Sequence, residues 1–398
     1  MIRSKYSSTV MSLVCAEFII FAHWGYSEFF SFQFVFFLFG LVIFLPYIVS
    51  QSSVLNCGIL TIVLFIAISF AADQDSHMIL KGIRTAIVIT LLFAAKRIAL
   101  TGKSQLIVAR ADILTRGLVI ACTISFVIGA FQLFDSLGGN SGFFDIPPNF
   151  FALDYGTLFF KTRSVLSAEG FFVRPSALFS EPSALALIGN ISFLIGLVNT
   201  NKRLTIVGLL TVLVSFSFSG FLICLFFYCY FIFVSKNKST VKISRKNILV
   251  FGFLFLCLGI FLLWGRISNI AASGDQSTDV RVIEPIRIFI DMISRQDYFG
   301  LSPELLVKRM SQNVSTVFDN WIFNQIMYYG VLGILPIALL FFLFGSGLGL
   351  IILVIGFTNG DLFYYDRLIF LMLLVVLYSS SKIKLSVKSN DFNRHGYV

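Results

Sequence analysis

The chain has 398 residues, of which 57% are hydrophobic and only 13% are charged. Soluble domains carry about 25% charged residues, so a chain this apolar cannot hide its nonpolar surface in one water-soluble core. We therefore expect lipid to be its solvent. The formal net charge is +10, and the preference of cytoplasmic loops for Lys and Arg accounts for it without a nucleic-acid partner.

Long runs of apolar residues follow one another along the chain, and runs of about 20 such residues are long enough to cross a bilayer as a helix. They predict an all-α polytopic membrane protein with about twelve transmembrane helices. The eleventh segment is short enough to be re-entrant. The predicted spans are 9–23, 29–49, 54–72, 79–95, 117–134, 182–198, 204–217, 220–235, 248–264, 322–344, 348–358 and 364–380.

The positive charge is distributed unequally between the two sides that these spans define. One side holds both termini, the loops 96–116 and 236–247, and the pair Lys202 and Arg203, which together carry 18 of the 30 Lys and Arg residues. Because short cytoplasmic loops are enriched in Lys and Arg, we predict that this side faces the cytoplasm. Both termini are then cytoplasmic.

The sequence predicts a single integral membrane domain over residues 1–398 with two large outward loops, 135–181 and 265–321. Long loops in a compact protein are usually functional. We expect each loop to form short amphipathic helices on the outer membrane face. In the second loop, the segment 279–293 repeats apolar residues at helical spacing. These residues are Val280, Ile283, Ile286, Ile290 and Ile293.

The outward side differs from the inward side in its choice of cation, since it carries nine Arg and three Lys. Arginine is preferred where a planar, bidentate contact to phosphate or carboxylate is needed. Arg266, Arg281 and Arg287 stand in the second loop among several carboxylates. Such a mixed cluster binds a charged head group, or it neutralises itself in water, and the sequence leaves both readings open.

Two motifs place a carboxylate where a loop meets a span. In the first, Arg174 and Glu181 flank an apolar turn, and Pro182 marks the start of a helix. The second is the pair Asp319 and Asn320 at the start of the tenth span. A carboxylate at such a place can accept a proton from a hydroxyl as a general base. Both motifs can also be helix caps.

Neither a metal nor a cofactor is predicted. Asp73, Asp75 and His77 could bind a divalent cation, but so short a pattern occurs often by chance. A nucleotide-binding glycine-rich loop with the spacing G-x-x-x-x-G-K-[ST] does not occur in the sequence.

The chain resembles the polytopic polysaccharide polymerases of the Wzy type and the related O-antigen ligases. The resemblance rests on the layout and on several motifs, which are Arg174–Ser183, the Ser-rich turn Ser215–Gly220, Arg281 in the second large loop, the turn Gly300–Ser302, the pair Asp319-Asn320, and the Gly330-x-x-Gly333 turn after it. It implies that the enzyme joins undecaprenyl-pyrophosphate-linked repeat units at the periplasmic face of a bacterial inner membrane. Both large loops would then be periplasmic.

The resemblance also implies roles for individual residues. Arg281 would neutralise the pyrophosphate leaving group, and Asp319 or Glu181 would deprotonate the acceptor hydroxyl. Substrate contacts would come from Arg174, Arg266, Arg287 and Asn320. The implied partners are lipid-linked glycans, membrane lipid and a chain-length regulator, and no metal is required.

Two alternatives stay open. A ligase would transfer the finished glycan to a lipid A core, but the family's ligases present a histidine where this chain has Asp319. A flippase or transporter of lipid-linked oligosaccharides would place charged residues within its spans, whereas the charge here gathers in the loops.

Overall fold

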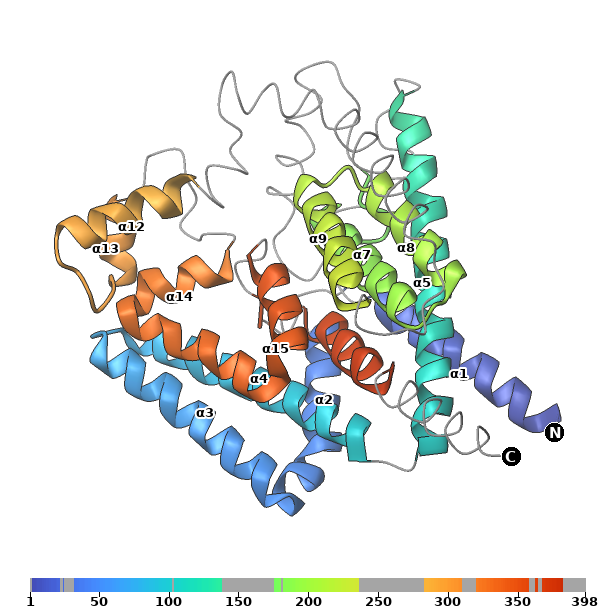
Figure 1. Ribbon diagram of the computed structural model, residues 1–398, viewed down its shortest axis with the longest axis horizontal. Helices are drawn as coiled ribbons and strands as arrows, with labels where there is room; N and C mark the ends of the chain where they lie inside the picture. The colour runs from blue at the N-terminus through green and yellow to red at the C-terminus, as the bar shows by residue number, and fades with distance from the viewer. Residues whose placement is uncertain are drawn as a thin grey trace. The chain divides into compact units, whose positions relative to one another are not determined.

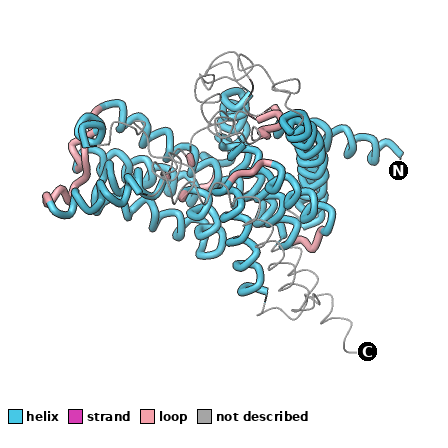
Figure 2. The backbone as a smooth tube through the Cα atoms, turned by 90° about the horizontal axis from the view of Figure 1, so that it is seen from above, coloured by secondary structure: helices cyan, strands magenta, loops and turns pink. Residues whose placement is uncertain are grey.

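The computed structural model describes residues 2–21, 24, 32–101, 104–137, 175–179, 182–235, 283–309, 320–357, 362–363 and 367–381. These residues form helices joined by turns, and Figure 2 colours no strand among them. The predicted all-helical fold class is therefore confirmed for the described part of the chain.

Most helices coincide with predicted spans, and α7 begins at Pro182 as the sequence predicts (Figure 1). An apolar helix without a label runs from Arg367 to Ser381. The labelled helices are α1 Ile2–Ile20, α2 Phe32–Ser50, α3 Ser52–Ala71, α4 Ser76–Thr101, α5 Ser104–Leu137, α7 Pro182–Val198, α8 Lys202–Val214, α9 Phe218–Ser235, α12 Glu284–Ser294, α13 Pro303–Arg309, α14 Trp321–Tyr329, the 3₁₀ turn η4 Gly330–Gly333, and α15 Ile334–Gly356.

Four helical segments in the described residues are long and apolar enough to cross a membrane. They are Ser52–Ala71, Ser76–Thr101, Arg110–Asp135 and Trp321–Gly356. Several shorter apolar helices, such as α7, accompany them. The described part of the chain is therefore all-helical and contains segments of membrane-spanning length. The total of about twelve crossings stays a prediction, and the predicted span 248–264 lies outside the described residues.

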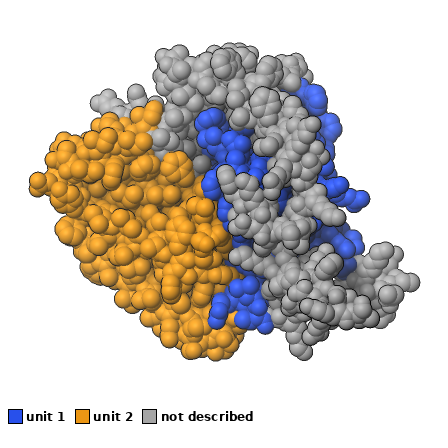
Figure 3. Space-filling view, viewed as in Figure 1, with its two compact units in different colours: residues 1–39, 97–263, 369–398 blue, residues 40–96, 264–368 orange. Residues whose placement is uncertain are grey.

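The chain divides into two compact units, each assembled from segments that are distant in sequence (Figure 3). The first unit comprises residues 1–39, 97–263 and 369–398. The second unit comprises residues 40–96 and 264–368.

In the first unit, small residues let helix backbones approach closely. A Cβ added to Gly208 of α8 would lie 2.5 Å from the backbone nitrogen of Phe193 in α7. Gly117 of α5 similarly faces Cys15 of α1, and Ser12 donates to the carbonyl of Ile113 at 3.2 Å. Such small-residue contacts are typical of helix pairs in membranes, where packing replaces the hydrophobic effect as the driving force.

In the second unit, α4 packs between α3 and the α14–α15 segment. Gly82 of α4 faces the Phe65 ring of α3. The start of α4 lies near α14, because Lys81 and Trp321 line one pocket. The other end lies near the middle of α15, where Lys96 donates to the carbonyl of Leu343 at 2.6 Å. α4 and the segment 321–344 therefore run in the same direction.

The segment after α14 is not a continuous helix. Gly330 has φ 58°, and η4 separates α14 from α15. Breaking a helix frees carbonyl groups that need donors. The loop after α12 supplies one donor, since the Leu301 amide donates to the Met327 carbonyl at 2.8 Å. Gln74 supplies another, since its Nε2 donates to the Tyr328 carbonyl at 2.7 Å.

A second break divides α15 at Gly345, which has φ 79° and ψ 165°. The chain reverses there, because a Cβ on Gly349 would lie 3.3 Å from the Cα of Phe341. α15 is thus a helical hairpin, and its turn falls between the predicted spans 322–344 and 348–358. Lys96 holds the last turn of the first arm through Leu343.

Candidate functional site

The structure describes two of the seven residues predicted for the site. Arg287 lies in α12, and Asn320 immediately precedes α14. The other five lie outside the described residues, and they are Arg174, Glu181, Arg266, Arg281 and Asp319.

Asn320 is the N-cap of α14. Its side-chain oxygen accepts a hydrogen bond from the Phe323 amide at 3.2 Å, and the residue is fully buried. The cap reading of this position is therefore confirmed.

Arg287 is held by Glu284 one turn earlier in α12. Its Nε donates to Oε2 of Glu284 at 2.9 Å, and its Nη2 donates to Oε1 of the same carboxylate and to the carbonyl of Arg309. Glu284 is only 5% exposed. The hydrogen bonds to Glu284 raise the pKa of the Arg287 guanidinium above its usual range. The charge of Arg287 is thus compensated within the protein.

Asp291 joins α12 to α13 through further ion pairs. Its carboxylate lies 2.8 Å from Arg295 Nε and 3.2 Å from Arg309 Nη1. Arg309 also lies 2.7 Å from Asp297. The hydrogen bond from Arg295, followed by the charges of the nearby arginines, lowers the pKa of the Asp291 carboxyl. The mixed cluster of the second loop therefore neutralises itself, at least over the described residues 283–309.

The centre of the first predicted motif is a buried turn. Pro175, Ser176, Ala177 and Phe179 are all buried, and Ala177 has φ 51°. Gln132 of α5 holds this turn, because its Oε1 accepts from the Ser176 amide at 3.1 Å and from the Ala177 amide at 2.8 Å. The turn is thus bound by a side chain of α5 that is more than 40 residues away in sequence.

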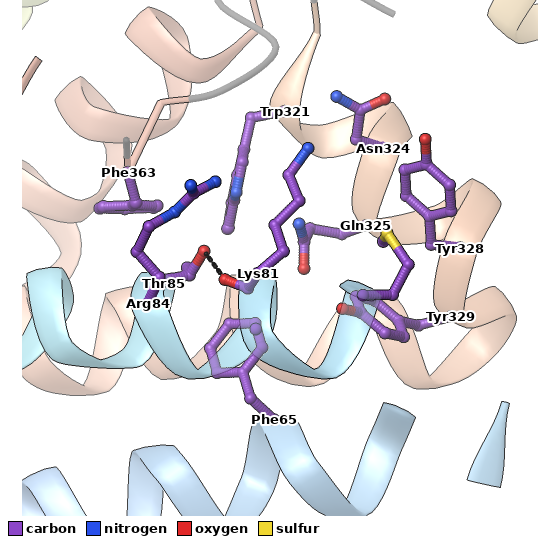
Figure 4. A pocket seen from close by; sticks show the side chains of 12 residues that line it. Phe65, Lys81, Arg84, Thr85, Trp321, Asn324, Gln325, Tyr328, Tyr329 and Phe363 are labelled. Carbon is purple, nitrogen blue, oxygen red and sulfur yellow. Dashed lines mark hydrogen bonds between the residues drawn. The ribbon is translucent and has the colours of Figure 1, made fainter. Parts of the chain in front are cut away.

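A small pocket with a cavity volume of about 20 Å³ opens in the second unit beside the break after α14 (Figure 4). In a membrane protein, irregular backbone is tolerated where it is buried in protein or lines a cavity. The pocket has room for one small polar group rather than for an oligosaccharide. It is lined by Phe65, Met78, Lys81, Gly82, Arg84, Thr85, Trp321, Asn324, Gln325, Tyr328, Tyr329 and Phe363.

Two cations stand on one wall of this pocket. Lys81 and Arg84 are three residues apart on α4, so they share a helix face, and both are half-buried. Their side chains extend from α4 toward α14 (Figure 4). Cations at the bundle interior of a membrane helix are costly and typically functional.

The opposite wall is formed by amides and aromatic rings of α14. Gln325 is 8% exposed, and its Oε1 is buried without a hydrogen-bond partner among the described residues. A buried acceptor of this kind costs about 1–3 kcal/mol when it stays unsatisfied. A ligand that combines an oxyanion with a hydroxyl would meet the cations on one wall and this acceptor on the other.

The sequence analysis did not select Lys81, Arg84 or Gln325. A signal for the first two was available, because both cations fall inside the predicted span 79–95. Gln325 carried no comparable signal, since its role depends on facing α4. The predicted base Asp319 lies two residues before Trp321 in sequence, and Trp321 lines the pocket.

The chain matches no known protein family model, no curated protein and no solved structure.

Proposed function

We propose that this protein polymerises undecaprenyl-pyrophosphate-linked repeat units into a surface polysaccharide such as O-antigen. The pocket formed by Lys81, Arg84 and Gln325 carries the proposal. It offers positive charge for an oxyanion and an acceptor for a hydroxyl, and its lining residue Trp321 lies two residues after the predicted base Asp319 in sequence. Its cavity has room for a water-sized group, so a phosphate of the lipid carrier would lie at the mouth of the pocket, with the glycan outside it.

The proposed reaction is a glycosyl transfer. A hydroxyl of the acceptor unit attacks the anomeric carbon of the donor glycan, and a glycosidic bond forms. The bond from that carbon to the pyrophosphate oxygen breaks, and the hydroxyl proton passes to Asp319 or Glu181. Lys81 and Arg84, with Arg281 and Arg174, stabilise the negative charge on the departing pyrophosphate. Fixed positive groups at a developing negative charge are usually the largest catalytic contribution.

The directions of packed helices support the proposed topology. α1 runs parallel to α5, and α4 runs parallel to the segment 321–344. These are the directions that the predicted order of crossings requires. With both termini in the cytoplasm of a bacterial cell, the pocket end of α4 faces the periplasm, where carrier-linked units are joined.

A surface-glycan gel tests the proposal. A strain lacking the gene is compared with the same strain carrying the wild-type gene. We expect the deletion to leave lipid cores capped by a single repeat unit, because export and attachment continue without polymerisation. Restoration of the ladder by the wild-type gene is the control.

Other outcomes would point to the alternatives. Polymer that accumulates on the lipid carrier while all cores lack repeats would indicate a ligase. Single carrier-linked units trapped on the cytoplasmic face would indicate a flippase. An unchanged ladder would contradict all three functions.

A further inference from the structure

Helix α12 presents three faces. One face packs into the second unit through Glu284, Ile288 and Met292, and it rests on α14. A charged face carries Arg287, Asp291 and Arg295. Between these two lies an apolar face that is open to the surroundings. Its residues are Ile283, Ile286, Phe289, Ile290 and Ile293, which are 51%, 42%, 37%, 60% and 53% exposed.

The segment 283–309, which includes α12 and α13, is neutral as a whole. Residues 283–309 contain four cations and four carboxylates. The cations are Arg287, Arg295, Lys308 and Arg309, and the carboxylates are Glu284, Asp291, Asp297 and Glu304. Most of them are joined in the ion pairs described above. Attraction to an anionic surface is therefore weak, and apolar burial must determine what covers the open face.

The position of α12 is fixed by its attachment to a segment of membrane-spanning length. The loop after α12 bonds to the turn after α14, because the Val331 amide donates to the Tyr298 carbonyl at 2.9 Å. Gly300 and Gly330 pass so closely that a Cβ on Gly330 would lie 2.6 Å from the Gly300 nitrogen. α12 is thus held beside the start of the segment Trp321–Gly356.

The apolar exposure continues from α12 along this attachment. Tyr298 and Phe299 are 52% and 63% exposed, and Val331 and Ile334 are 62% and 55% exposed. Val331 and Ile334 belong to the segment of membrane-spanning length. Aromatic residues at the edge of a membrane-spanning segment are typical of the boundary between acyl chains and head groups. The open face of α12 is therefore continuous with a surface that lipid would cover.

We infer that α12 is an interfacial helix whose open face is covered by the outer edge of a bilayer leaflet. The partner is the phospholipid surface itself. Zwitterionic lipid suffices, since the charges of α12 and α13 compensate one another. An amphipathic helix of this kind lies in the plane of the interface with its apolar side among the upper acyl chains. The inference is independent of the reaction proposed above.

Photocrosslinking of the full-length chain in liposomes tests the inference. A benzophenone amino acid replaces Ile290 on the open face, Arg295 on the charged face, or Val63 of α3, which is 54% exposed in the middle of a candidate span. Mass spectrometry detects the lipid adduct. We expect an adduct at Ile290 and Val63, and its loss at Arg295, because water gives no stable benzophenone product.

Two further measurements complete the test. One varies the lipid composition of the liposomes, and the other looks for crosslinked protein dimers on a gel. Liposomes of phosphatidylcholine alone should give the same adduct at Ile290 as liposomes that also contain phosphatidylglycerol. An adduct that requires phosphatidylglycerol would overturn the claim that burial of apolar groups suffices. A crosslinked dimer at Ile290 would show that a second copy covers the face. Equal labelling of Ile290 and Arg295, or none at Ile290 when Val63 is labelled, would overturn the inference.

Discussion

Arginine and lysine serve two different purposes in the second unit. Arg287 is bound by a buried carboxylate, so its charge contributes to the attachment of α12 to α13. Lys81 and Arg84 stand on one wall of a pocket whose opposite wall holds a buried amide acceptor. The difference comes from the neighbours of each side chain. The pocket cations are therefore the better test of chemistry.

Replacement of Arg84 by alanine should abolish most polymer while leaving the protein in the membrane. Loss of one preorganised group that stabilises developing charge lowers the rate by about 10²–10³. Arg84→Lys should retain only part of the wild-type polymer yield, because the planar guanidinium group, which can make two parallel hydrogen bonds, is lost. The measurement is the glycan ladder in a complemented deletion strain, with the protein quantified by immunoblot. Arg110→Ala is the matched control, because Arg110 is an exposed arginine of α5. A normal ladder from Arg84→Ala would remove Arg84 from the site.

Replacement of Gln132 by leucine should destabilise the protein. The Ser176 and Ala177 amides would lose their acceptor, and a buried group without its partner costs about 1–3 kcal/mol. Thermal unfolding in detergent measures the effect. Gln51→Leu is the control, since Gln51 is exposed and its side chain makes no cap hydrogen bond. Equal unfolding temperatures for the two variants would contradict this account of the turn.

Asp291 should make stability depend on pH in the acidic range. Its pKa is lowered in the folded protein, so its ion pairs stabilise fully above the ordinary carboxyl pKa of 3.8. The contribution disappears as the pH falls from that value through the lowered folded pKa. The wild type should unfold at a higher temperature than Asp291→Asn at neutral pH, and the difference should vanish in strong acid. A difference that persists in strong acid would point to another cause.

Helix breaks organise the second unit at the scale of elements. The turn after α14 allows the polypeptide to form one side of the pocket, and its freed carbonyls are bound by Leu301 and Gln74. Gly345 serves a different purpose, because it reverses the chain within α15. Both glycines have positive φ, but only the first is in close contact with another backbone.

Gly330→Ala should be more damaging than Gly345→Ala. Each substitution places a side chain in the left-handed region, which costs about 1–2 kcal/mol. At Gly330 the new Cβ would also lie 2.0 Å from the Tyr298 carbonyl oxygen, whereas nothing lies within 4 Å at Gly345. Unfolding temperature and polymer yield should both fall further for Gly330→Ala. Equal effects would mean that the close contact between the two turns contributes little.

At the scale of the whole molecule, each unit contains a pair of parallel helices that are distant in sequence. In the first unit α5 is parallel to α1, and in the second unit α4 is parallel to the segment 321–344. These directions agree with the crossing order that the charge distribution predicts.

Alkaline phosphatase fusions test this topology, because the enzyme is active only when exported. A fusion after Asp75 should be active, and a fusion after Thr200 should be inactive. Both fusion sites follow apolar helices, so each fusion is the control for the other: the two differ only in the side of the membrane on which the enzyme is predicted to lie. Reversed activities would invert the proposed orientation, and the pocket would then face the cytoplasm.

The amino-acid sequence by itself determined the class of this protein and many of its helix boundaries. Apolar length and caps are local properties, so Pro182 begins α7 and the predicted spans 322–344 and 348–358 meet at the Gly345 reversal. The amphipathic segment of the second loop was likewise predicted, and α12 covers the part of it that the structure describes. Ile283, Ile286, Ile290 and Ile293 lie on the open face, while the packed face belongs to Glu284, Ile288 and Met292.

Only the tertiary structure decided which of the charged and polar residues meet. Gln325 lines a pocket because it faces Lys81 and Arg84, which are distant in sequence. Arg287 is bound by the carboxylate of Glu284, which is buried beside it. The turn after α14 similarly depends on Gln74 and on the loop after α12. Helix propensity and hydropathy depend on neighbours along the chain. A pocket depends on which helix faces pack together, and that choice is made by contacts between distant segments.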